Sequence, residues 1–427
     1  MVLFVFIITL FLLLALGMHI AVALGLTAAC LLFVFEGMPI IIIAQNAFSS
    51  INSYALAAIP FFILTGDIVL EGRLSERMLD FAGIILRRVQ GGLAMAVVVA
   101  SVFFAAVSGS SVASAAALGR SAVELLKDED YPKRFIAGLV AAGSTMGLMI
   151  PPSLTFIIIG AMQGLPIIKL FTAGILPGLT EGILTLATCW YLCKKHGWGK
   201  GRVYNSPSSS NIGFGTIFKG SAGVLMMPLI ILGGIYLGFF TPTEVAAVAA
   251  GYALILAVVI HRTLLPGNIF PTMQKSLMQA GMIYFIIIGG KLCGFMLISL
   301  GITDTITGVV AGSGIHPWLF LLIVNLLLLM LGAVLDGISV IVLTAPILFP
   351  IAISLGIHPI HFAVIITANV EVATLTPPVG LNLFVMSGVT GLPVAEVARG
   401  IGPFYAVQIA VLLIATYVPF LSLALIN

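Results

Sequence analysis

Charged residues are scarce in this chain. Only 8% of its 427 residues are Asp, Glu, Lys or Arg, and the formal net charge is +3. A soluble domain carries roughly a quarter charged residues, so this composition excludes an ordinary soluble enzyme or binding domain. We expect no nucleic-acid partner, because the few basic residues lie between apolar segments and form no basic patch.

Cysteines and nucleotide-binding motifs are also sparse. The four cysteines form neither a disulfide framework nor a zinc-binding spacing. No P-loop is present, so we expect no ATP to be used by this chain. Hydrophobic residues, in contrast, make up 61% of the sequence, and the mean hydropathy is +1.24. These values predict an all-α polytopic protein embedded in a lipid bilayer.

Apolar segments long enough to cross a bilayer recur along the chain. We predict spans at 2–17, 19–36, 51–70, 135–160, 167–193, 221–240, 242–260, 276–299, 360–388 and 397–425. The first segment lacks a preceding basic region and a cleavage motif, so we expect it to be a retained span and not a signal peptide.

Two further apolar segments are interrupted halfway. Ser108-Gly109-Ser110-Ser111 interrupts one and Asp336-Gly337-Ile338-Ser339 the other, which predicts two re-entrant helical hairpins. Pro151-Pro152 and Pro377-Pro378 break two of the predicted spans in the same way. Unwound backbone is tolerated at membrane depth only where protein or a cavity satisfies it. Paired interruptions are therefore typical of a secondary transporter.

The interruptions recur at a nearly constant offset. Pro377 follows Pro151 by 226 positions, and Asp336 follows Ser108 by 228. Each predicted repeat has five crossings, an odd number, so the second copy must be inverted in the membrane. The first repeat is 1–193, with scaffold spans 2–70, an interfacial arm 74–90, a hairpin 92–130, a broken span 135–160 and a span 167–193. After a cytoplasmic linker, 194–220, the second repeat is 221–427, with scaffold spans 221–299, an arm 302–314, a hairpin 317–356, a broken span 360–388 and a span 397–425.

Basic residues support this topology. With the loop 71–90 placed in the cytoplasm, all of the 18 Lys and Arg residues except Lys169 and Lys291 lie on the cytoplasmic side. Such a bias is the positive-inside rule. It places both chain ends in the periplasm and opens the two hairpins from opposite sides.

The broken sites offer oxygen ligands for small cations. A helix that ends in the membrane leaves free carbonyl groups with partial negative charge. We predict a first Na⁺ site at Ser108, Ser110, Gly147 and Pro151, the last two through their main-chain oxygens. We predict its inverted counterpart at Gly332, Asp336, Thr374, Thr376 and Val379. Two or more ions are expected. Small residues at such places also mark ordinary helix packing, which is the competing interpretation of either cluster alone.

Polar side chains beside the breaks are candidates for contact with a transported solute. These are Ser111, Ser153, Ser339 and Asn382. No arginine is predicted at the membrane midplane. We therefore expect an anionic solute to be held by helix N-termini, hydroxyl groups and bound Na⁺.

Several segments resemble one known family. Phe240-Thr241-Pro242-Thr243-Glu244-Val245-Ala246-Ala247-Val248-Ala249, the segment 59–66, the hairpin 108–119 and Pro151-Pro152-Ser153 are similar to the large membrane subunit of tripartite ATP-independent periplasmic (TRAP) transporters, above all to sialic-acid systems. The resemblance implies the elevator-type architecture of the ion-transporter superfamily and location in the bacterial inner membrane. It also implies Na⁺-coupled uptake of an organic acid, a small four-helix membrane subunit and a periplasmic substrate-binding protein. The second tip departs from the first, because it is poorer in serine.

Three other functions remain as alternatives. A stand-alone Na⁺/carboxylate symporter would share the architecture but not the signature at 240–249. An intramembrane enzyme would need a catalytic pair at midplane, and none is convincingly placed, so we expect no enzyme activity. A channel fits less well, because hairpins that open from opposite sides suit alternating access.

Overall fold

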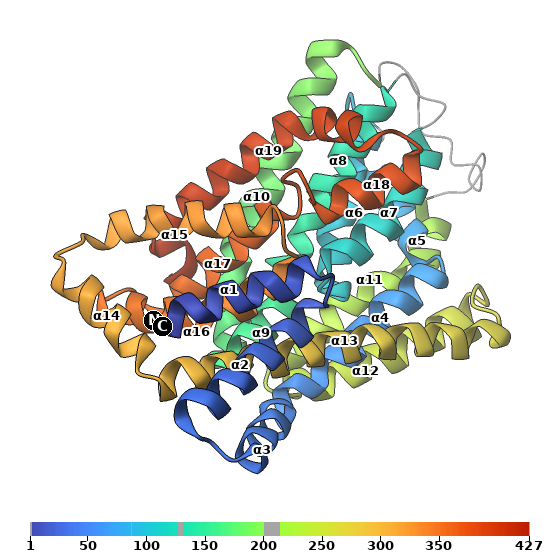
Figure 1. Cartoon of the computed structure of the whole chain (residues 1–427). Coiled ribbons are helices and arrows are strands. Elements are labelled where there is room, and N and C mark those ends of the chain that lie inside the picture. The colour runs from blue at the N-terminus through green and yellow to red at the C-terminus, as the bar shows by residue number, and fades with distance from the viewer. Residues whose placement is uncertain (1, 87, 127–130, 200–213, 427) are drawn as a thin grey trace.

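The computed structural model describes residues 2–86, 88–126, 131–199 and 214–426 (Figure 1). All regular secondary structure in these ranges is helical. Within them, six helices are long and apolar enough to cross a membrane, as judged by length and composition. The predicted all-α membrane fold is thus confirmed.

The first half of the chain contains both predicted interruptions. Its helices are α1 (Val2–Ala15), α2 (Ile20–Glu36), α3 (Ile40–Ile51), α4 (Ala58–Glu71), α5 (Leu74–Leu86), α6 (Gly92–Ser108), α7 (Ser111–Leu126), α8 (Lys133–Thr145), α9 (Leu154–Gln163) and α10 (Ile167–His196). Helices α6 and α7 form the first hairpin, and α8 and α9 are the two halves of the first broken span.

The second half repeats this order. Its helices are α11 (Phe214–Tyr236), α12 (Pro242–Ile255), α13 (Pro266–Ser299), α14 (Ile302–Gly312), α15 (Pro317–Gly332), α16 (Gly337–Ser354), α17 (Pro359–Ala373), α18 (Leu381–Thr390), α19 (Val394–Tyr417) and the short α20 (Phe420–Leu423). Helices α15 and α16 form the second hairpin, and α17 and α18 the second broken span.

One helix and one boundary differ from the prediction. Helix α3 was not predicted, because its polar residues lower the hydropathy of the segment. Asn46 and Ser50 instead bond to main-chain carbonyls one turn back, at 3.0 and 2.6 Å, which lets them stay helical in an apolar setting. The predicted linker 194–220 is too long: α10 continues to His196 and α11 begins at Phe214, while positions 200–213 lie outside the described residues.

The segment at 240–249 has a simple structural role. Thr241 caps helix α12 by accepting a hydrogen bond from the Glu244 main-chain N–H at 3.3 Å, and the Glu244 carboxylate accepts one from the Thr241 N–H at 2.8 Å. This capping box satisfies two N–H groups that the helix start would leave free.

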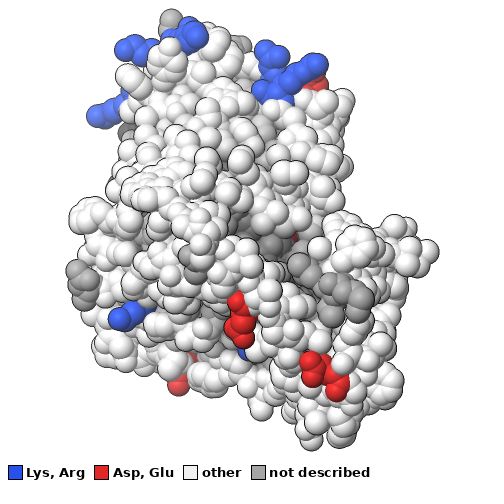
Figure 2. All heavy atoms as spheres, turned by 60° about the vertical axis from the view of Figure 1, so that its left-hand side comes forward, with Lys and Arg blue, Asp and Glu red and all other residues white. Residues whose placement is uncertain are grey.

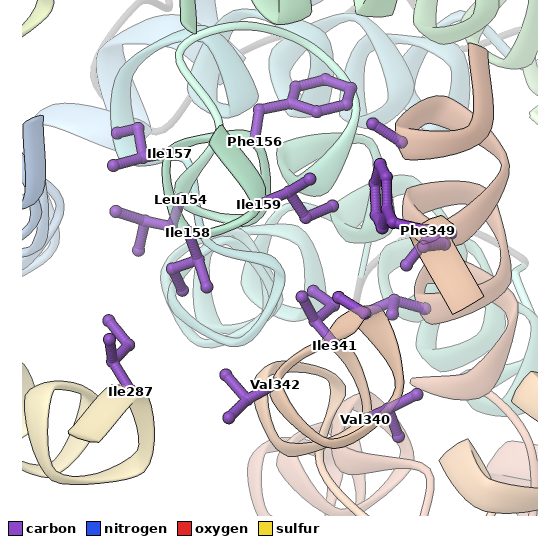
Figure 3. Close-up of a cluster of buried hydrophobic side chains, with 14 of the residues drawn as sticks. Leu154, Phe156, Ile157, Ile158, Ile159, Ile287, Val340, Ile341, Val342 and Phe349 are labelled. Atoms are coloured by element: carbon purple, nitrogen blue, oxygen red, sulfur yellow. The ribbon is translucent and has the colours of Figure 1, made fainter. Parts of the chain in front are cut away.

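The two repeats interlock through their hairpins. Helix α9 of the first repeat packs on α16 of the second, with Ile158 and Ile159 on the side of α9 toward Ile341 (Figure 3). Helix α13 lies beside this cluster and approaches α16 so closely that a methyl group added at Gly290 would stand 1.7 Å from the Val342 side chain. The second hairpin is therefore held against a neighbouring span by a contact that only a small residue permits.

The charge distribution agrees with a membrane orientation. Figure 2 shows most Lys and Arg side chains gathered at one end of the molecule, above a broad uncharged band. Both chain ends lie together at one side in Figure 1, beside α14 and α16.

Candidate functional site

The first hairpin tip is a tight turn built from serines. Helix α6 ends at Ser108, Gly109 adopts a left-handed conformation with φ of 60°, and α7 begins at Ser111. The Ser108 and Ser114 hydroxyls are 3.0 Å apart, and Ser114 donates to the Ser110 carbonyl at 2.8 Å. These bonds fix the turn without any charged group.

This tip rests directly on the first break. The Leu154 N–H donates to the Gly109 carbonyl at 3.3 Å. A methyl group at Gly147 would stand 3.2 Å from the Ser110 carbonyl oxygen, so the two backbones are in contact. The structure thus brings together Ser108, Ser110 and Gly147. Pro151 lies in the same turn, and its bond to Pro152 is cis, as is Pro377–Pro378 in the other repeat.

The second tip is organised by a carboxylate. Asp336 caps α16: its Oδ2 accepts from the Ser339 N–H at 3.0 Å, and its Oδ1 accepts from the Ser339 hydroxyl. The Val379 N–H donates to the Ala333 carbonyl at 3.0 Å, so this tip also rests on a Pro-Pro break. Gly332 faces α17, because a methyl group there would stand 2.3 Å from the Ala373 side chain.

The two threonines of the second break use their hydroxyl groups locally. Thr374 donates to the Glu371 carbonyl at 2.7 Å, and Thr376 donates to that of Val372 at 2.8 Å. The Tyr405 hydroxyl of α19 lies 3.0 Å from the Thr376 hydroxyl. Sequence reasoning missed Tyr405, because nothing distinguishes it within an apolar span.

Two of the four candidate solute residues meet across the repeats. The Asn382 amide donates to the Ser111 hydroxyl at 2.6 Å and to the Ala141 carbonyl at 3.1 Å. Asn382 is fully buried, and its Oδ1 has no partner among the described residues. Ser153 instead caps α9, accepting from the Phe156 N–H at 3.4 Å, and Ser339 is occupied by Asp336.

A buried polar network lies behind both breaks. Thr145 and Gln408 each donate to one Glu181 carboxylate oxygen, at 3.0 and 3.1 Å. Glu181 and Glu371 are only 1% and 3% exposed. Packing of α8, α10, α17 and α19 buries them, which sequence spacing does not reveal.

The oxygen atoms at the breaks suit a hard monovalent cation. In the described part of the chain, no N–H or hydroxyl donates to the main-chain carbonyls of six positions: Ser108, Gly147, Pro151, Gly332, Thr376 and Val379. Unpaired carbonyls at membrane depth cost free energy unless an ion or water satisfies them. No group of three or more His, Cys, Asp and Glu gathers among the described residues, so the available donors are chiefly neutral oxygens.

Known proteins resemble the chain over nearly its whole length. The family profile described as "Tripartite ATP-independent periplasmic transporter, DctM component" matches residues 7–421. A C4-dicarboxylate TRAP transporter large permease protein of Pseudomonas aeruginosa is 39% identical over 95% of this chain and 94% of its own. A sialic acid TRAP transporter large permease protein of Vibrio cholerae is 31% identical, over 96% of this chain and 95% of its own. The crystal structure of the Alcanivorax borkumensis YdaH transporter has the same fold, with a TM-score of 0.61 at 14% identity and 89% coverage of each chain.

Proposed function

This chain belongs to the DctM family of tripartite ATP-independent periplasmic transporters, and from that premise we propose that it couples organic acid uptake to Na⁺ binding at its two hairpin tips. Membership makes it a multi-pass large permease subunit of the bacterial inner membrane, and not an enzyme. It also implies a small membrane subunit and a periplasmic binding protein, since the system has three parts.

One observation carries the proposal. In each repeat a hairpin tip accepts a main-chain hydrogen bond from the residues that follow a Pro-Pro break, Leu154 in one case and Val379 in the other. The unpaired carbonyls of both sites lie at these junctions. A bound Na⁺ would satisfy oxygens of the tip and of the break together, and would thereby hold the hairpin closed on its broken span.

Helix N-termini supply the complementary charge for the solute. Helices α7, α9, α16 and α18 all begin at the tips or breaks. The N–H groups at these helix starts that no cap engages carry partial positive charge and favour an anion. The carboxylate of the solute is then held beside the Na⁺ ions without a buried arginine, and it is released when the ions leave.

Alternating access follows from an elevator movement. The moving part would comprise the two hairpins, the broken spans, α10 and α19. The scaffold would comprise α1–α4, α11–α13 and the two interfacial arms, α5 and α14. The solute would arrive on the periplasmic binding protein, and a four-helix small subunit would support the scaffold. The resemblance seen in the sequence favours sialic acid, with a C4-dicarboxylate or another sugar acid as alternatives, and the 39% identical relative is named for C4-dicarboxylates.

Reconstitution tests the coupling. The chain is placed in proteoliposomes with its small subunit, and uptake of radiolabelled sialic acid and succinate is measured with the loaded binding protein outside. We expect uptake of one of them only when Na⁺ is outside. Equal uptake with K⁺ replacing Na⁺, at matched pH and membrane potential, would exclude Na⁺ coupling. Uptake by this chain alone would favour the stand-alone symporter.

A further inference from the structure

A polar cavity lies apart from the two hairpin tips. It measures about 390 Å³ and lies between α3 and α13 on one side and the end of α9 and α16 on the other. Its polar lining residues are Asn46, Ser49, Ser50, Gln163 and Lys291. The cavity therefore joins the proposed scaffold to the proposed moving part.

Lys291 is the charged group of this cavity. It is half-buried within α13, and none of the three ion pairs in the described part of the chain includes it. No hydrogen bond of its ammonium group is found among those residues either. A cation held in an apolar span without a partner is costly, and such residues mark solute or ion pathways more often than not.

The remaining lining suits a carboxylate. No Asp or Glu lines the cavity, and the side-chain amides of Asn46 and Gln163 have N–H groups that can donate hydrogen bonds to an anion. The Ser49 and Ser50 hydroxyls donate to the Asn46 main-chain carbonyl and add only polar surface. A volume of this size falls within the usual range of small-molecule sites, roughly 300–1,000 Å³. The cavity thus presents one positive charge, neutral donors and room for a small organic acid.

Its position separates it from the Na⁺ sites. Pro346 and Pro350 of α16 line the cavity, and Pro346 is ten residues beyond Asp336. Ten helical residues span about 15 Å. In the orientation set by the basic residues, this displacement is toward the periplasm, where the solute arrives.

We propose that Lys291 and the side-chain amides of Asn46 and Gln163 form an outer carboxylate-binding subsite, which receives the organic anion before it reaches the hairpin tips. The transport role of this subsite rests on the proposed function, whereas its binding chemistry rests on the cavity alone. A lysine that merely extends to the membrane surface would make no contact with the solute.

Protection from chemical labelling tests binding directly. The assembled system is treated from outside with a membrane-impermeant amine reagent, and modification of each lysine is quantified by mass spectrometry. We expect saturating sialic acid or succinate to slow modification of Lys291 at least several-fold. Lys169, the one basic residue predicted on the outer side, should be unaffected. Equal rates at Lys291 with and without either acid would overturn the subsite.

Substitutions test its role in uptake. Lys291→Gln should raise the half-saturating concentration of loaded binding protein about tenfold, because loss of one hydrogen bond to a charged group weakens binding by about that factor. Lys291→Arg should stay near wild type, and Lys169→Gln provides the control for general surface charge. The Na⁺ dependence should be unchanged in all three. An unaltered half-saturating concentration in Lys291→Gln, or an equal change of that concentration in Lys169→Gln, would refute the role of Lys291 in uptake. Na⁺-independent uptake by the wild type would instead refute the coupling and leave this comparison valid.

Discussion

The two hairpin tips have the same backbone plan and different side-chain chemistry. Both accept a main-chain hydrogen bond from the segment after a cis Pro-Pro bond, through Gly109 in the first repeat and Ala333 in the second. The first tip is neutral and held by serine hydroxyls, whereas Asp336 organises the second. The comparison teaches that the backbone junction is the common element, and that the side chains around it differ between the repeats.

The contacts between repeats show a similar asymmetry. Helix α9 meets α16 through aliphatic side chains (Figure 3). Helix α18 instead meets α7 through the Asn382–Ser111 hydrogen bond. Both pairs join a broken span of one repeat to the hairpin of the other. The polar pair fixes a specific register, since a buried amide without its partner is penalised.

The largest effect should come from the backbone junction of the first tip. A side chain at Gly109 would stand 2.6 Å from the Pro152 carbonyl oxygen, and the left-handed φ adds strain. Gly109→Val should abolish Na⁺-dependent uptake and destabilise the folded protein by about 1–3 kcal/mol. Uptake and thermal unfolding in nanodiscs measure both.

The second tip supplies the matched control. Ala333 already carries a methyl group at the equivalent acceptor, so Ala333→Gly should retain most uptake. If Gly109→Val transports like wild type, uptake does not require the close contact between the first tip and its break. The main-chain junction that the two repeats share would then have no role in transport.

The charge difference between the tips predicts the next largest effect. Asp336→Asn keeps a good helix cap and removes the negative charge. It should raise the half-saturating Na⁺ concentration about tenfold or more, because a formal charge attracts a cation more strongly than a neutral oxygen does. Ser110→Ala at the neutral tip should change it only a few-fold, because the other predicted ligands of that site, which include the main-chain oxygens of Gly147 and Pro151, are retained.

Titration of uptake against external Na⁺ separates these outcomes. Equal shifts in Asp336→Asn and Ser110→Ala would show that the carboxylate only caps α16. Glu396→Gln, at an exposed ion pair with Arg399, controls for loss of a carboxylate elsewhere.

The Asn382–Ser111 bond should have a moderate effect. Asn382→Ala and Ser111→Ala each remove one partner, and a double-mutant cycle isolates their coupling. We expect about 0.6 kcal/mol, the mean found for hydrogen bonds between membrane helices. Thermal unfolding with and without Na⁺ gives the four stabilities. Strict additivity would mean that the bond contributes nothing to holding the repeats together.

The hairpins and breaks could be predicted because their signals are local. Glycine, serine and proline clusters interrupt an apolar run wherever they occur, so the tips at 108–111 and 336–339 follow from sequence alone. Helix α3, Tyr405 and the Glu181–Gln408 contact could not, because each depends on which spans pack together. Spacing also gave no sign that Ser153 caps a helix while Asn382 bridges the repeats.

The smallest effect is expected at Thr376. Its hydroxyl is already engaged by the Val372 carbonyl and lies beside the Tyr405 hydroxyl, while its main-chain carbonyl has no donor among the described residues. If Na⁺ is bound through that carbonyl, Thr376→Val should alter the half-saturating Na⁺ concentration no more than about threefold, because the main chain is retained. The Thr305 hydroxyl in arm α14 likewise donates to the main-chain carbonyl four residues back. Thr305→Val therefore controls for the loss of such a hydrogen bond within a helix. A shift in Thr376→Val as large as that in Asp336→Asn would make the hydroxyl a direct ligand, and the second site would then depend on side chains more than on backbone.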